Sequence, residues 1–103
     1  MTATSTVEGH RSELADGILR LTISRPRRMN AIDLATLSAL RDAVTAADAD
    51  TRVRTIVITG EGKAFCTGAD LAAGAANPQN PAVAMEATTG LIRAITDCSV
   101  PVI

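Results

Sequence analysis

One stretch decides the fold class of this chain: Ile56-Val-Ile-Thr-Gly-Glu-Gly-Lys-Ala-Phe-Cys-Thr-Gly-Ala-Asp-Leu71. Its β-branched apolar start is typical of a buried strand. The small residues that follow allow a ligand to approach the backbone closely, and the run from Gly68 to Leu71 is typical of a turn that leads into a helix. Because the first N–H groups of a helix lack intrahelical partners, this pattern predicts a main-chain site for an anion or for an oxygen that gains negative charge.

The sequence upstream of this stretch predicts a hairpin and a helix. Asp16-Gly17 is a strong turn pair, and it separates candidate strands over residues 12–15 and 18–24. Asp33 is a good N-cap residue, and leucines and a valine at helical spacing follow it to about residue 48.

The remaining segments complete an alternating pattern. Residues 53–59 and 100–103 are typical of buried strands, residues 82–97 of a helix, and residues 74–81, with two prolines, of a flexible loop. Alternating strands and helices predict an α/β layer with parallel pairing. Residues 1–10 are polar and are expected to form a flexible tail.

Composition limits the class of protein. A chain of 103 residues forms one domain at most, and with 47% apolar but only 1% aromatic residues its core must be built from Ala, Val, Leu and Ile. The net charge of -1 argues against binding to nucleic acid or membranes through bulk charge. No apolar run approaches the ~20 residues that span a bilayer. Cys66 and Cys98 form no metal-spaced pair, so we expect reduced thiols in a cytoplasmic protein, and no metal site.

Two motifs, in this order, resemble the crotonase superfamily, the enoyl-CoA hydratase/isomerase family. They are Ser24-Arg-Pro-Arg-Arg-Met-Asn-Ala-Ile32 and Gly60-Glu-Gly-Lys-Ala-Phe-Cys-Thr-Gly-Ala-Asp-Leu71. The family patterns are N-R-P-x-x-x-N-A-L and G-x-G-x-A-F-C/S-A-G-A-D-L. The departures are Ser24 for Asn, Ile32 for Leu and Thr67 for Ala. None of them removes a backbone donor, and the resemblance extends from about residue 14 to the last residue.

The resemblance implies that residues 11–103 form the N-terminal part, the first third to half, of a crotonase-like ββα-superhelix. Family members are longer, so we expect the chain to be cut at Ile103. The implied activity of the full protein is the hydration of 2-enoyl-CoA to 3-hydroxyacyl-CoA. Its partner would be the acyl-CoA substrate, with no further cofactor, and its assembly a homotrimer or a dimer of trimers. The family's two catalytic glutamates and second oxyanion donor are absent from this chain, so residues 1–103 alone are expected to be inactive.

The resemblance also implies roles for single residues. The backbone N–H of Ala69 would be one of two oxyanion donors to the thioester oxygen, which gains negative charge as an enolate forms. Asp70 is not expected to be catalytic, because a carboxylate in the first turn of a helix is favoured by the helix dipole alone. The residues expected to contact acyl-CoA lie in the two motifs: Arg28, Ala31, Ala64, Gly68, Ala69, Asp70 and Leu71.

Other kinds of glycine-rich or nucleophilic site fit the sequence less well. A phosphate-binding G-x-x-x-x-G-K-[ST] loop fails because Val57 replaces its first glycine and Ala64 its hydroxyl residue. A dinucleotide fingerprint fails at its third glycine, where Phe65 stands. Cys66 has no evident activating base, because the one histidine, His10, lies in the expected tail and is given no chemical role.

Several polar residues allow more than one interpretation. Arg25, Arg27 and Arg28 either line a solvated loop or contact CoA phosphates, which suit the donor fork of arginine. Asn30 is expected to tie a loop together through its side chain. Glu61 and Lys63 are expected in a solvated turn, and a surface position is expected for Glu86.

Two alternatives to hydration stay open at this stage. The same motifs occur in crotonase-like isomerases, hydrolases and decarboxylases, which differ in residues that this chain lacks. The chain could also be a truncated, non-catalytic module that binds CoA or a partner subunit.

Overall fold

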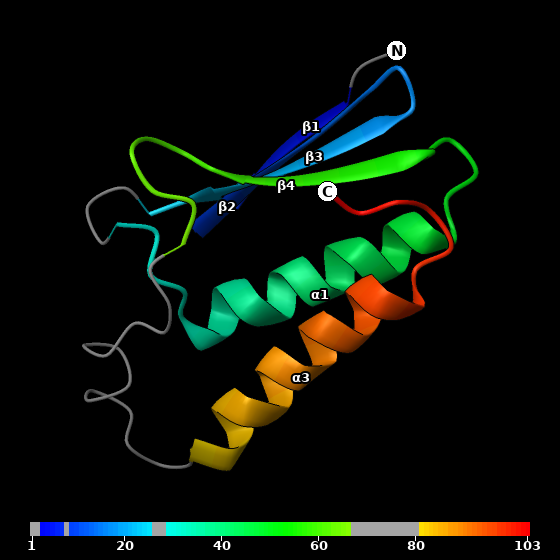
Figure 1. Cartoon of the computed structure of the whole chain (residues 1–103). Coiled ribbons are helices and arrows are strands. Elements are labelled where there is room, and N and C mark those ends of the chain that lie inside the picture. Colours follow the sequence, from blue (N-terminus) through cyan, green and yellow to red (C-terminus); the bar gives the residue numbers. More distant parts are fainter. Residues whose placement is uncertain (1–2, 8, 26–28, 67–80) are drawn as a thin grey trace.

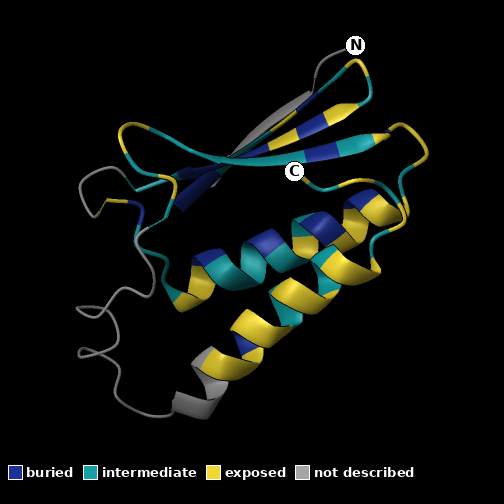
Figure 2. Cartoon of the chain, in the orientation of Figure 1, coloured by how far each residue is buried: buried dark blue, intermediate teal, exposed yellow. Residues whose placement is uncertain are grey.

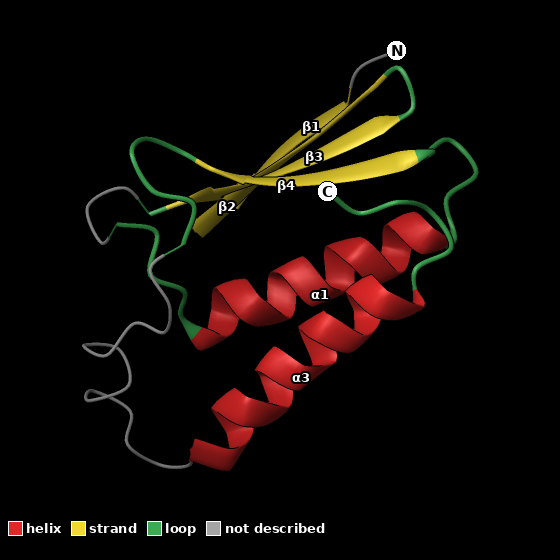
Figure 3. Ribbon diagram, in the orientation of Figure 1, coloured by secondary structure: helices red, strands yellow, loops and turns green. Residues whose placement is uncertain are grey.

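The computed structural model describes residues 3–7, 9–25, 29–66 and 81–103. Within them, a four-stranded sheet is covered on one face by a helix, α1, and a second helix, α3, packs on the outer side of α1 (Figure 1). The strand order in the sheet is β1-β2-β3-β4, and along the chain β1, β2 and β3 come before α1, which β4 and α3 follow (Figure 3). Their bounds are β1 Ala3–Val7, β2 Gly9–Ala15, β3 Ile18–Ser24, α1 Leu34–Asp48, β4 Thr55–Gly60 and α3 Pro81–Asp97.

The predicted hairpin is confirmed. β2 and β3 pair antiparallel, and the pair Ala15–Ile18 closes a two-residue turn. Asp16 and Gly17 both have positive φ, at 54° and 81°. This is the backbone of the turn type that matches the twist of the flanking strands, and Asp-Gly adopts it at little cost.

The expected flexible tail over residues 1–10 is wrong for the residues of this segment that the structure describes. β1 forms the edge of the sheet and pairs antiparallel with β2, from Ala3 opposite Leu14 to Val7 opposite His10. The strand has the sequence Ala-Thr-Ser-Thr-Val. Threonine and valine favour extended backbone, and pairing with β2 satisfies the N–H and C=O groups on the side of β1 that faces β2.

α1 joins two parallel strands. Asp33 caps the helix by accepting a hydrogen bond from the Thr36 N–H at 2.9 Å, as predicted. Leu40 and Val44, one turn apart, are buried on the side that faces the sheet. β4 then pairs parallel to β3, which confirms the predicted parallel layer. β4 begins two residues later than predicted, and Val53 is buried in the preceding loop.

α3 confirms the helix predicted over residues 82–97, with one correction. Pro81, predicted in a loop, is the first residue of the helix; proline is tolerated there because the first N–H groups of a helix have no intrahelical acceptor. Residues 74–80 lie outside the described residues. After α3 the chain returns to the sheet, where Val102 forms a parallel bridge with Ile56, as the strand predicted over residues 100–103 requires.

The core lies between the sheet and α1, where dark blue dominates in Figure 2. Leu21, Ile23, Leu40, Val44 and Ile56 are at most 1% exposed. The cluster contains only Leu, Ile, Val and Ala side chains, which confirms the aliphatic core that the composition predicts. Among the described residues, no helix is long and apolar enough to cross a membrane.

Candidate functional site

The two motifs meet at one end of the sheet. Residues 29–33, which follow β3, and residues 61–66, which follow β4, lie beside the start of α1 (Figure 1). Parallel strands bring their carboxyl ends to the same edge, so the β3–α1–β4 unit places these two segments together. This edge is the place where open α/β sheets most often bind ligands.

Asn30 is the residue that ties the two motifs to each other. It is fully buried, and its Nδ2 group donates to the backbone oxygens of Glu61 at 2.8 Å and Ala64 at 2.5 Å. Its Oδ1 accepts from the Arg25 N–H at 2.8 Å. Both the Nδ2 group and the Oδ1 atom of the side-chain amide are therefore hydrogen-bonded. A buried polar side chain stabilises the fold when its donors and acceptors are satisfied in this way. The prediction that Asn30 ties a loop is confirmed.

The backbone at this point is held in an uncommon conformation. Met29 and Asn30 have φ values of 54° and 59°. The left-handed region costs an ordinary residue about 1 kcal/mol or more, and asparagine is among the side chains that tolerate it best. The Asn30 N–H donates to the Arg25 oxygen at 2.9 Å and closes this tight loop. The side-chain bonds of Asn30 therefore hold a strained turn in place.

Arg25 has a structural role that neither interpretation of the basic cluster anticipated. Its NH1 group donates to the Ala31 oxygen, and NH2 lies 3.7 Å from the Asp33 carboxylate. Its side chain is only 18% exposed. For Arg25, the solvated-loop alternative is therefore wrong, because its guanidinium is turned inward onto the first motif, and the contact with CoA phosphates stays a prediction. Arg27 and Arg28 lie outside the described residues.

Asp33 connects this loop to α1. Burial raises the pKa of Asp33, but hydrogen bonding from Thr36 and the positive charge of Arg25 outweigh that effect, so its pKa lies below the ordinary value. The carboxylate is consequently charged at neutral pH, as a helix N-cap favours.

Glu61 lies in the turn after β4 with its side chain 41% exposed, as expected, but it also makes contacts that the sequence did not predict. Its carboxylate accepts a hydrogen bond from the Ser24 hydroxyl, and its Oε1 lies 3.9 Å from the Arg11 guanidinium. Its N–H also donates to the Ile23 oxygen at 2.9 Å. Lys63 is exposed, as expected. Sequence reasoning missed Glu61 because Ser24 is 37 residues away and no local pattern links them.

The predicted site residues divide into two groups. Ala31 and Ala64 lie in the described loops, and their carbonyl oxygens accept from Arg25 and Asn30. The structure thus brings these two residues into one hydrogen-bonded network. The others lie outside the described residues: Arg28, Gly68, Ala69, Asp70 and Leu71. The oxyanion role of Ala69 and the structural role of Asp70 therefore stay predictions.

The cysteines and Glu86 are placed as follows. Cys66 and Cys98 are not joined in a disulfide, and both pack partly buried against the core. Glu86 is exposed on α3, which confirms its expected surface position.

His10 and Thr36 form a buried polar region near the start of α1. His10 is 6% and Thr36 1% exposed, and neither His10 Nδ1 nor Thr36 Oγ1 has a hydrogen-bond partner in the part of the chain that the structure describes. Burial lowers the pKa of His10, which favours the neutral ring. The alternation of β2 could have revealed this position, because His10, Ser12 and Leu14 face the same side as their apolar partners on β3.

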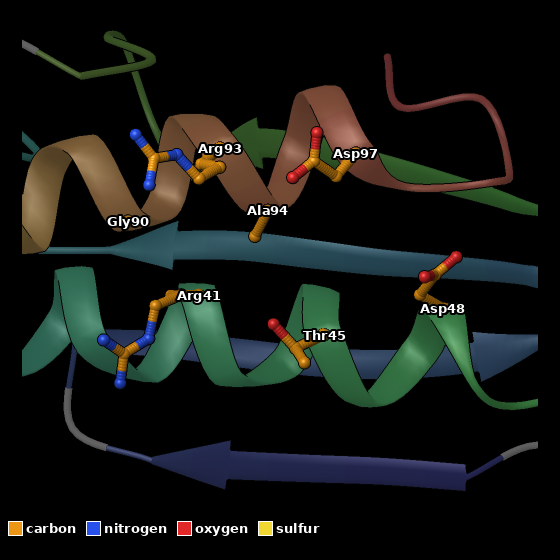
Figure 4. A pocket seen from close by; sticks show the side chains of 7 residues that line it. All are labelled: Arg41, Thr45, Asp48, Gly90, Arg93, Ala94 and Asp97. Carbon is orange, nitrogen blue, oxygen red and sulfur yellow. The ribbon is translucent and has the colours of Figure 1, made fainter.

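The structure also contains a groove away from the motifs. It has a volume of about 300 Å³ and lies along the seam between α1 and α3 (Figure 4). Its lining residues are Arg41, Thr45, Asp48, Gly90, Arg93, Ala94 and Asp97. Figure 4 shows the two arginines toward one end and the two aspartates toward the other. None of the predicted site residues lines it, so the motifs, and not this groove, define the candidate site.

Within residues 3–7, 9–25, 29–66 and 81–103, no three His, Cys, Asp or Glu residues are grouped so as to hold a metal ion.

Comparison with known sequences gives consistent matches. A family model described as enoyl-CoA hydratase/isomerase matches residues 13–103. A probable enoyl-CoA hydratase of Rhodobacter capsulatus is 41% identical over 96 residues, which are 90% of this chain and 36% of that protein. A probable enoyl-CoA hydratase of Mycobacterium tuberculosis is 37% identical over 86 residues, which are 81% of this chain and 33% of that protein. The chain thus spans about a third of the length of these curated relatives.

Comparison with solved structures agrees. The crystal structure of an enoyl-CoA hydratase from Mycobacterium avium subsp. paratuberculosis matches with a TM-score of 0.84 at 30% identity, over 95% of this chain and 38% of that one. An enoyl-CoA hydratase/isomerase from Pseudoalteromonas atlantica matches with a TM-score of 0.78 at 26% identity, over 93% of this chain and 37% of that one.

Proposed function

Because this chain belongs to the enoyl-CoA hydratase/isomerase family and has the fold of the N-terminal part of a crotonase-like ββα-superhelix, we propose that it supplies half of the oxyanion hole and part of the CoA site for the hydration of 2-enoyl-CoA. In this proposal the chain contributes one oxyanion donor and part of the CoA-binding surface. The full-length protein would form 3-hydroxyacyl-CoA. Hydratase is favoured over the isomerase, hydrolase and decarboxylase reactions because the matched relatives carry that name.

One observation carries the proposal. Asn30 of the first motif donates to the backbone of Glu61 and Ala64 in the second motif. The two segments that the resemblance assigns to acyl-CoA are therefore one hydrogen-bonded unit rather than separate loops. Ala69 follows Ala64 by five residues in the second motif.

The proposed chemistry depends on the backbone of this unit. As water adds to the double bond of an enoyl thioester, negative charge develops on the thioester oxygen. The N–H of Ala69 would donate to that oxygen, and a donor fixed beforehand stabilises the charge without reorganising during the reaction. A backbone donor makes no demand on its own side chain, so alanine is sufficient at position 69. The residues proposed to hold the CoA portion are Arg28, Ala31, Ala64, Gly68, Ala69, Asp70 and Leu71.

The proposal extends to the assembly and its location. We expect the full-length protein to be a homotrimer or a dimer of trimers in the cytoplasm, without a cofactor beyond the CoA of its substrate. The catalytic carboxylates and the second oxyanion donor would lie in a part of the fold that this chain does not contain. Residues 1–103 alone are therefore expected to bind a CoA thioester but not to hydrate it.

The test compares crotonyl-CoA with CoA by isothermal titration calorimetry, using wild type and Ala69→Pro. Proline lacks the N–H group but is tolerated in a first helical turn, so the variant removes one donor with little else. We expect weaker binding of crotonyl-CoA and unchanged binding of CoA. Thr67→Ala, which introduces the usual family residue, is the matched control and should bind both as wild type does.

Three results would contradict parts of this proposal. If the folded wild type binds neither compound, the CoA site is wrong. If Ala69→Pro binds crotonyl-CoA as tightly as wild type does, the donor assignment is wrong. If residues 1–103 hydrate crotonyl-CoA, the expected inactivity is wrong. If the chain binds both compounds, and the substitution at residue 69 changes neither affinity, the chain would be a non-catalytic CoA-binding module.

A further inference from the structure

Glu61 is fixed at three points, and this number of contacts is unusual for a residue in a turn. Its N–H donates to Ile23 on β3 at 2.9 Å, its C=O accepts from Asn30 at 2.8 Å, and its carboxylate accepts from the Ser24 hydroxyl at the end of β3. The first two contacts use the backbone, which any residue could supply. The third depends on the side chains of Glu61 and Ser24.

We propose that Glu61 is a positioning residue, whose carboxylate fixes the loop over residues 61–66, which contains the proposed CoA-contacting residue Ala64, to the end of β3. This inference rests on the proposed function for its purpose, but the structural part stands separately. Asn30 holds the loop from the side of residues 29–33, and Glu61 holds it from the sheet. A loop attached on two sides cannot rotate about either attachment alone.

The identity of residue 24 supports this role. This position is where the chain departs from the family pattern, with serine in place of asparagine. A serine hydroxyl is short and stays close to the backbone, so its partner must reach toward it, and the Glu61 side chain is long enough to do so. The contact joins the last residue of β3 to the first residue after β4. Ser24 and Glu61 therefore act as a pair, and replacing either residue removes the hydrogen bond between them.

The hydrogen bond, and not the nearby ion pair, is the important contact. Arg11 on β2 is 3.9 Å from Glu61, and both side chains are about 40% exposed, at 40% and 41%. Exposed pairs at such distances contribute little. A hydroxyl that donates to a carboxylate makes a charge-assisted bond, which is stronger than a neutral one. Glu61→Gln keeps an acceptor oxygen for the Ser24 hydroxyl but loses the charge, so we expect it to retain about half of the effect.

The experiment measures amide hydrogen exchange in the 103-residue chain for wild type, Ser24→Ala, Glu61→Ala and the double variant. The reporters are the N–H of residue 61, which donates to Ile23, and the N–H of Asn30, which donates to Arg25. Loss of one such bond should raise exchange at both reporters about tenfold. The double variant should exchange like either single variant, because both single changes remove the same contact. Glu86→Ala, an exposed carboxylate on α3, is the control and should change neither reporter.

A role in global stability alone would give a different pattern. The amides of the β2–β3 pairing report on the sheet as a whole. The inference is overturned if exchange of these amides rises by the same factor as at residue 61, if the single variants exchange like wild type, or if their effects add in the double variant. Exchange in Glu61→Gln that lies between wild type and Glu61→Ala supports the hydrogen bond, whereas exchange equal to that in Glu61→Ala overturns it. If Glu61→Ala does not fold, the exchange rates of Ser24→Ala and Glu61→Gln still test the positioning role of Glu61.

The same variants separate this inference from the proposed function. Glu61→Ala should weaken binding of crotonyl-CoA, whereas Glu61→Gln should weaken it less. If wild type does not bind crotonyl-CoA, the proposed function fails and the exchange result still tests the positioning role. If wild type binds it and Glu61→Ala binds it equally well, the positioning role is overturned and the proposed function stands.

Discussion

The side chain of Asn30 offers the sharpest test of how the two motifs are joined. Asn30→Ala removes three hydrogen bonds, to the Arg25 N–H and to the carbonyl oxygens of Glu61 and Ala64. Each such bond contributes on the order of 1 kcal/mol net, so we expect a loss of about 3 kcal/mol in the free energy of unfolding. That is a large part of the stability of a small domain, which is roughly 5–15 kcal/mol.

The assay is urea unfolding followed by far-UV circular dichroism, because the chain has no tryptophan or tyrosine to report by fluorescence. With a denaturant dependence of about 1.5 kcal/mol per M, the expected loss moves the midpoint down by about 2 M. A change below about 0.5 kcal/mol would refute the reasoning, since three bonds to a fully buried side chain could not then be significant.

Two further substitutions at position 30 separate the contributions. Asn30→Gly loses the same bonds but accepts the positive φ of 59°, so it should be about 1 kcal/mol less destabilised than Asn30→Ala. Asn30→Asp keeps the acceptor and the shape but places a carboxylate against two carbonyl oxygens, so it should be at least as destabilised as Asn30→Ala. If Asn30→Asp is as stable as wild type, the two Nδ2 donors do not hold the loop.

Two other predictions concern the start of α1. Gly9→Ala should cost about 3 kcal/mol, because φ is 95° and the new methyl group would lie 2.2 Å from Thr36 Oγ1; equilibrium unfolding measures this. Gly17→Ala, where the nearest atom is the mobile Arg54 side chain, is the control and should cost less, so equal costs would contradict the steric argument. Asp33→Ala should cost about 1 kcal/mol at pH 7 through loss of the helix cap. Since the pKa of Asp33 is lowered in the folded state, its contribution is present above its ordinary value of 3.8 and is lost as the pH falls through the folded value. Unfolding of wild type and Asp33→Ala should therefore converge below about pH 4, and a constant difference down to pH 2 would contradict the assignment.

The parts of the fold that local chemistry determines were predictable from the sequence. Asp16-Gly17 requires a tight turn, and Asp33 with the apolar spacing behind it requires a helix start, so both were placed within one residue. β1 was missed because its evidence is not local. Its side chains resemble those of a polar tail, and only the register with residues 10–14 of β2 makes the segment a strand.

The candidate site was predictable to a smaller extent for the same reason. The two motifs predicted the loops and the role of Asn30, because a motif is a pattern of residues that are close together in the sequence. They did not give Arg25 turned inward, or Glu61 bound to Ser24, since those contacts arise only when the β3–α1–β4 unit brings separate segments together. The main-chain donor at Ala69 lies in a segment that the structure does not describe, so its role depends on the proposed experiment.

The pairing of Val102 with Ile56 has a consequence for the order of folding. The β2–β3 hairpin closes over two residues, whereas this bridge joins residues that are 46 positions apart. The entropic free-energy cost of closing a loop rises by about 0.6 kcal/mol for each doubling of the loop length. Pairings between distant residues therefore slow folding. We therefore expect the hairpin to form early and residues 101–103 to join the sheet last. The N–H of Ile103, which donates to Ile56, would then become protected later in refolding than the hairpin amides.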